Sequence, residues 1–84
     1  MSPDEARQLI EAVLHEIAPE ADVAEVGPDE TLQEGLDLDS IDFLNFVVAL
    51  HERTGLEIPE RDYPRLSTLQ GGIEYLVAGV PAAG

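Results

Sequence analysis

The sequence predicts an all-α fold: a small antiparallel bundle of three main helices plus one short helix, with a long first loop. Three stretches repeat apolar residues at helical spacing, and no stretch sustains the polar–apolar alternation of a strand. Helix-capping residues precede these stretches. The 84 residues are 44% hydrophobic, which suits one small core. We expect a single domain over residues 1–78 and a flexible tail over residues 79–84.

The first helix begins at a strong capping signal. Ser2 is a suitable N-cap, Pro3 fits the first helical position, and Glu5 completes a capping box. Pro19 ends the helix. Its apolar face comprises Ala6, Leu9, Ile10, Val13 and Ile17.

Residues 18–38 form a long connection, punctuated by glycine and proline. Loops of this length are uncommon in compact domains unless they serve a function. We expect its apolar residues to anchor it to the core, namely Val23, Val26, Leu32 and Leu36.

The second helix follows from the stretch "LDSIDFLNFVVALHERTG". Asp39 is its predicted N-cap, Ser40 its first residue, and Asp42 suits the positive end of the helix dipole. Gly55 is its predicted left-handed cap.

Two apolar stripes run along this helix. A domain this small can hardly bury both, so we expect one to face the core and the other to stay partly exposed beside Ser40. An exposed apolar ridge rimmed by acids is typical of a protein-docking surface. The core stripe is Phe43, Phe46, Val47 and Leu50, and the exposed ridge is Ile41, Leu44 and Val48.

The remaining chain predicts a short helix near Arg61–Tyr63 and a final helix capped by Ser67 or Thr68. Gly71 and Gly72 inside the final helix each cost about 1 kcal/mol relative to alanine, and we interpret them as permitting a close helix contact. The predicted apolar side of this helix is Leu69, Ile73, Leu76 and Val77.

Composition excludes several function classes. Eighteen acids face four arginines and no lysine, giving a net charge of −14, so nucleic acid is a poor partner and a basic protein surface is the natural complement. We predict neither a membrane span nor a signal peptide, and expect a cytoplasmic monomer. Without cysteine or lysine, the chain can form no disulfide and attach no biotin or lipoyl arm, and any thiol must come from a cofactor.

Catalysis is not expected. His15 and His51 are the candidate bases, and Ser40 lies eleven residues from His51 on one predicted helix, about 16 Å away, whereas a serine–histidine pair needs about 3 Å. Asp37, Asp39 and Asp42 match a calcium loop poorly, so we predict no specific metal site. A calcium-binding module remains a remote alternative.

The stretch "LDLDSIDFLNFVVALHERTGLEIPERDYPRLSTLQGGIEYL" resembles the acyl carrier protein family. The likeness rests on the Asp-Ser-Ile signature after a long loop, on "TGLEIP", and on the "STL" that opens the last helix. It implies that Ser40 receives 4′-phosphopantetheine from coenzyme A through a phosphopantetheinyl transferase, and that Asp39 assists this enzyme. It further implies that Ile41, Leu44, Val48 and Asp42 meet acyl-loading and acyl-processing enzymes with basic docking surfaces.

The resemblance leaves the pathway open. Fatty-acid carriers typically have glutamate at the position of Asn45 and leucine at that of Phe46, so a freestanding acyl carrier of a dedicated pathway, such as polyketide biosynthesis, is our interpretation. Phe43 and Phe46 would fill the space between helices, which favours short cargo or cargo held outside. The alternatives are an aminoacyl or peptidyl carrier, whose usual glycine-rich lead is absent from "GLDLDS", and an acidic adaptor whose serine is never modified.

Overall fold

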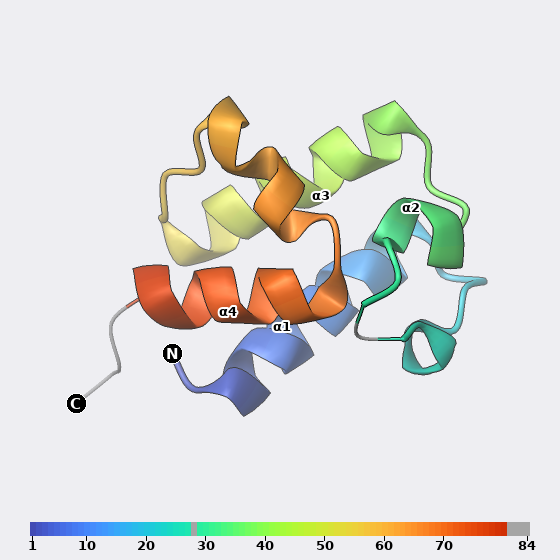
Figure 1. The fold of residues 1–84 in the computed structure, drawn as a ribbon, viewed down its shortest axis with the longest axis horizontal. Coiled ribbons are helices and arrows are strands. Elements are labelled where there is room, and N and C mark those ends of the chain that lie inside the picture. Colours follow the sequence, from blue (N-terminus) through green and yellow to red (C-terminus); the bar gives the residue numbers. More distant parts are fainter. Residues whose placement is uncertain (28, 81–84) are drawn as a thin grey trace.

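The computed structural model describes residues 1–27 and 29–80, and in them it confirms the all-α fold. α1 (Pro3–Ile17) runs against the direction of both α3 (Ser40–Thr54) and α4 (Leu69–Gly79), and packs on each of them (Figure 1). Three shorter elements complete the fold: the 3₁₀ segments η1 (Val23–Glu25) and η2 (Glu60–Leu66), and the one-turn α2 (Leu32–Gly35).

The predicted helix caps are confirmed. Ser2 and Glu5 form a capping box at α1, and Thr68 accepts a hydrogen bond from the Gly71 amide at the start of α4. Gly55 ends α3 in the left-handed conformation, with φ of 72°. These caps satisfy backbone groups that helix ends otherwise leave without partners.

The connection between α1 and α3 is more structured than predicted, because η1 and α2 interrupt it. Val26, Leu32 and Leu36 are buried as expected, and Val23 is half-buried. A link that the sequence did not indicate holds α2 in place: the Leu32 amide donates to the Ser67 carbonyl, 2.7 Å away, just before α4. Buried apolar side chains and a backbone hydrogen bond therefore both hold the connection against the bundle.

The core lies between α1, α3 and α4. Its fully buried larger side chains come from each main helix and from the connecting segments, namely Ile10, Val13, Leu14, Leu32, Phe46, Leu50, Leu66 and Leu76. The predicted inner side of α4 needs one correction: Val77 is 36% exposed, and Tyr75 is buried in its place.

Tyr75 faces inward because its ring and its hydroxyl both find partners there. The hydroxyl donates to Asp62 Oδ2 at 2.8 Å, and the Arg65 guanidinium lies 4.9 Å from the ring centre. Burial, followed by the bond to Asp62, raises the pKa of Tyr75 above its ordinary value. Tyr75 thus connects α4 to η2 on the side of η2 that packs against α4.

Gly71 and Gly72 do permit close contacts, as predicted. A β-carbon at Gly71 would lie 2.3 Å from the Arg65 carbonyl oxygen, and one at Gly72 would lie 3.1 Å from Ile10 Cδ1. The first neighbour is backbone, which cannot rotate aside, and the second is the end of a flexible side chain.

We expect Gly71→Ala to destabilise the protein, although alanine is the better helix former. The clash with the Arg65 carbonyl must shift η2 or α4, and overpacking of this kind costs about 1–3 kcal/mol. Urea denaturation followed by circular dichroism measures the change. Gly72→Ala is the matched comparison and should cost clearly less, since Ile10 can move. Equal effects would contradict the steric explanation.

The predicted boundary at residue 78 falls inside α4, whose last residue is Gly79. Val80 follows, and its amide donates to the Leu76 carbonyl. The rest of the predicted tail, residues 81–84, lies outside the described residues.

Candidate functional site

Ser40 is exposed on the first turn of α3, at the junction of loop and helix. Figure 1 shows α3 beginning at the end of the loop that follows α2. The preceding Asp39 is the N-cap, and its Oδ1 accepts from the Asp42 amide at 2.8 Å. Asp42 completes a capping box, since its Oδ2 accepts from the Asp39 amide at 3.4 Å. Asp39 is therefore the residue that caps α3, and the hydroxyl of Ser40 is not needed for capping.

The backbone leading to Ser40 is firmly placed. Leu36 and Leu38 are buried on either side of Asp37, which is exposed and adopts a left-handed φ of 55°. Aspartate tolerates this conformation better than most residues. The Leu38 amide also donates to the Gln33 carbonyl at 3.0 Å. The site consequently sits on a fixed turn rather than on a loose loop.

The surroundings of Ser40 fit a covalently attached phosphate. The first amides of a helix have no acceptor within the helix, and the helix dipole favours negative charge there. Asp37, Asp39 and Asp42 lie within three residues of Ser40 and oppose a free anion. These opposing effects fit a phosphate bonded to Ser40 better than a freely diffusing one.

The two predicted stripes of α3 separate as expected. Phe46, Val47 and Leu50 are buried and Phe43 is half-buried. The ridge residues Ile41, Leu44 and Val48 are 70%, 47% and 43% exposed. The prediction that this ridge is exposed is confirmed, and its role in docking stays a prediction.

His51 does not form a catalytic pair with Ser40. His51 lies on α3 with Ser40, eleven residues away and so about 16 Å along the helix. Its Nδ1 lies 2.8 Å from the Leu56 carbonyl oxygen, which ties the ring to the loop after α3. His15 is exposed on α1.

The acidic residues near Ser40 do not assemble a metal site. Across residues 1–27 and 29–80, no group of three or more His, Cys, Asp or Glu side chains is placed to hold a metal ion. None of the helices in that part of the chain is long and apolar enough to cross a membrane.

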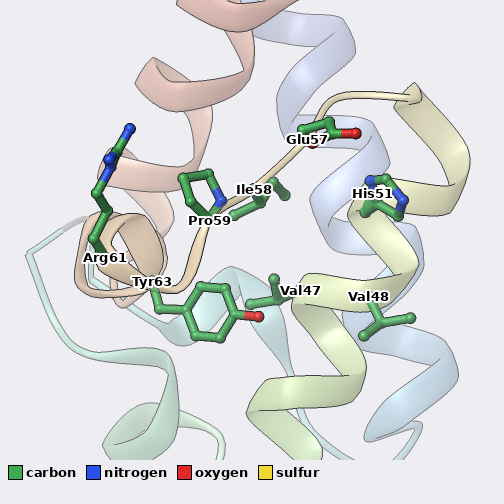
Figure 2. A pocket seen from close by; sticks show the side chains of 8 residues that line it. All are labelled: Val47, Val48, His51, Glu57, Ile58, Pro59, Arg61 and Tyr63. Carbon is green, nitrogen blue, oxygen red and sulfur yellow. The ribbon is translucent and has the colours of Figure 1, made fainter.

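A groove of about 620 Å³ lies between α3 and η2, and sequence analysis did not anticipate it (Figure 2). Val47, Val48 and His51 line it from α3, and Ile58, Pro59 and Tyr63 line it from the opposite side. No local signal could have indicated this groove, because it depends on where η2 packs. The sequence indicates His51 only as a candidate base and Tyr63 only as part of a short helix.

Comparison with known proteins agrees with this geometry. Residues 4–76 match the family described as phosphopantetheine attachment site. An acyl carrier protein of Streptomyces coelicolor is 35% identical over 79 residues, covering 94% of this chain and 82% of that protein. One from Myxococcus xanthus is 32% identical over 74 residues, covering 84% and 94%. The chain belongs to the acyl carrier protein family, whose cofactor is covalently attached phosphopantetheine.

Proposed function

We propose that this protein carries acyl groups as thioesters on a 4′-phosphopantetheine arm attached to Ser40. The observation that supports this site best is a comparison of the three serines. Ser2 Oγ accepts from the Glu5 amide and lies outside the matched residues 4–76, and Ser67 Oγ donates to the Pro64 carbonyl at 2.7 Å. Ser40 is exposed, lies inside the matched region and has no such structural bond among the described residues.

Attachment requires one phosphoryl-transfer step. The Ser40 oxygen forms a bond to the phosphorus of coenzyme A that bears the pantetheine, and the pyrophosphate bond of coenzyme A breaks. Adenosine 3′,5′-bisphosphate leaves, and the hydroxyl proton passes to a base of the transferase. The exposed position of Ser40 lets an external enzyme reach it, and we assign Asp39 a supporting role in recognition by this enzyme.

Mass spectrometry tests the proposal directly. The protein is incubated with coenzyme A, magnesium and a broad-specificity phosphopantetheinyl transferase, and a parallel sample omits the transferase. A single phosphopantetheinyl increment in the first sample alone is expected, and fragmentation should place it on Ser40. An unmodified protein would leave the acidic-adaptor alternative standing and overturn the carrier.

The ridge beside Ser40 should be part of the docking surface. We expect Leu44→Ala to lower the transferase kcat/KM about tenfold through a higher KM, equivalent to about 1.4 kcal/mol. Val77→Ala, which truncates another exposed apolar residue on a different helix, is the matched control and should leave the rate unchanged. A similar loss in both variants would refute a specific role for the ridge.

The middle of α3 supports a carrier for a dedicated pathway. Asn45 and its neighbours up to His51 carry no acid, so the partner enzymes should meet the middle of this helix with an apolar surface, while their basic residues meet the acids around it. The lead "GLDLDS" is not the glycine-rich lead usual in peptidyl carriers, which favours acyl over aminoacyl cargo. A fatty-acid ketosynthase should therefore use the acyl form more slowly than it uses a housekeeping carrier. Equal turnover would argue for the housekeeping role.

A further inference from the structure

α2 connects the turn before Ser40 to the start of α4. The Leu38 amide, in that turn, donates to the Gln33 carbonyl of α2 at 3.0 Å. From the same short helix, the Leu32 amide donates to the Ser67 carbonyl at 2.7 Å. Figure 1 shows α2 next to the segment that leads into α4. The backbone that carries the proposed attachment site is therefore joined to the far end of the sequence through one turn of helix.

Two threonines form the second part of this connection. Thr31 and Thr68 pair as an antiparallel bridge, which holds the starts of α2 and α4 side by side. Each is also an N-cap: Thr31 Oγ1 accepts from the Glu34 amide at 3.2 Å, and Thr68 Oγ1 accepts from the Gly71 amide at 3.0 Å. Thr31 therefore both caps α2 and lies at its contact with α4.

α2 depends on its cap more than the longer helices do. A single helical turn makes too few hydrogen bonds to offset the cost of nucleating it, so its surroundings must stabilise it. The side chain that caps it is that of Thr31, which is half-buried. Loss of an N-cap threonine should raise the population of molecules in which α2 is open about fivefold.

Opening of α2 would also release the turn before Ser40. The bond from Leu38 to α2 would be lost, and Leu36, which follows α2 directly, would lose its buried position. Asp37 between them has a φ of 55°, a conformation that a non-glycine residue keeps only while its surroundings impose it. A transferase that binds the ordered turn would then find a smaller fraction of competent molecules, which lowers its apparent affinity.

We infer that Thr31 is a positioning residue for the attachment reaction: by capping α2, it holds the turn that presents Ser40 to the transferase. This inference rests on the proposed attachment at Ser40. It adds to that site a residue that lies outside α3 and its exposed ridge, and that acts through the backbone rather than by contact with the reacting atoms.

Two variants that each lose one helix cap test the inference. Thr31→Ala removes the cap of α2, and Ser2→Ala is the matched control, because Ser2 Oγ accepts from the Glu5 amide at 3.1 Å in the same way at α1. With a broad-specificity transferase and coenzyme A, we expect Thr31→Ala to lower kcat/KM about twofold or more through a higher KM. Ser2→Ala should leave kcat/KM unchanged. Amide hydrogen exchange at Leu38 should become about fivefold faster in Thr31→Ala and stay close to wild type in Ser2→Ala.

A conservative variant separates the cap from other properties of the side chain. Thr31→Ser keeps the hydroxyl, and serine is at least as good an N-cap as threonine, so both kcat/KM and the exchange rate at Leu38 should return to wild-type values. An unchanged kcat/KM in Thr31→Ala, or an equal loss in Ser2→Ala, would overturn the inference while leaving the carrier function intact. Failure of the wild-type protein to load Ser40 at all would overturn both.

Discussion

Replacing Ser40 with alanine is expected to abolish attachment of phosphopantetheine while leaving the fold unchanged. No hydroxyl would remain at the first turn of α3, and the other two serines are held in hydrogen bonds within their own helix ends. The N-cap of α3 is Asp39, not Ser40, so its capping box persists in the variant. Alanine is also a good helix former, and the change in unfolding free energy should stay within about 0.5 kcal/mol.

The intact mass of the variant after incubation with the transferase and coenzyme A measures whether phosphopantetheine is attached. Circular dichroism measures whether the helical content is unchanged. Ser67→Ala is the matched control: it removes a hydroxyl close to another helix start, and with it the bond to the Pro64 carbonyl. Losing that bond should lower the unfolding free energy by about 1 kcal/mol, and it should leave the attachment of phosphopantetheine to Ser40 unchanged. A modified Ser40→Ala protein would show that the arm is attached elsewhere.

Phe46→Ala should have the largest effect on stability. Phe46 is fully buried at the centre of α3, and truncating a buried phenylalanine costs about 3–5 kcal/mol, which includes the cavity left behind. A domain of 84 residues has about 4–13 kcal/mol of unfolding free energy in total. The variant should therefore lose a large part of its stability and, at the lower end, unfold in the absence of denaturant.

Leu44→Ala is the internal standard for this experiment, because it truncates an apolar residue two positions away on the same helix. Leu44 is 47% exposed, and its loss should change the unfolding free energy by no more than about 0.5 kcal/mol. Urea unfolding curves give both values under one condition. If the two variants were equally destabilised, the assignment of separate core and exposed stripes on α3 would be wrong.

Features encoded within one turn of the chain were predictable from the sequence. The caps at Ser2, Asp39 and Gly55 depend on neighbouring residues, and so their helix boundaries were found. The exposure of Leu44 and its ridge followed from domain size and the periodicity of α3. The candidate position of Ser40 was likewise visible, since a loop–helix junction is a local property.

Features that depend on distant partners were not predictable. α2 is a single turn, which is too short to be stable alone. It is held by the hydrogen bond from the Leu32 amide to the carbonyl of Ser67, a residue distant in the sequence. Tyr75 replaced Val77 in the core because Asp62 and Arg65 lie where its hydroxyl and ring can use them. The groove depends on η2 packing against α4, which no periodicity reveals.

The fixed turn formed by Leu36, Asp37 and Leu38 has a consequence for how enzymes meet this protein. Because two buried leucines anchor the backbone before Ser40, we expect the pivot of the proposed arm to be the serine side chain itself. The thiol then sweeps a hemisphere of about 17 Å radius centred on the start of α3. The entrance to the active site of every enzyme that uses the cargo must lie inside that hemisphere. The active site itself can lie no deeper below the entrance than the arm can extend.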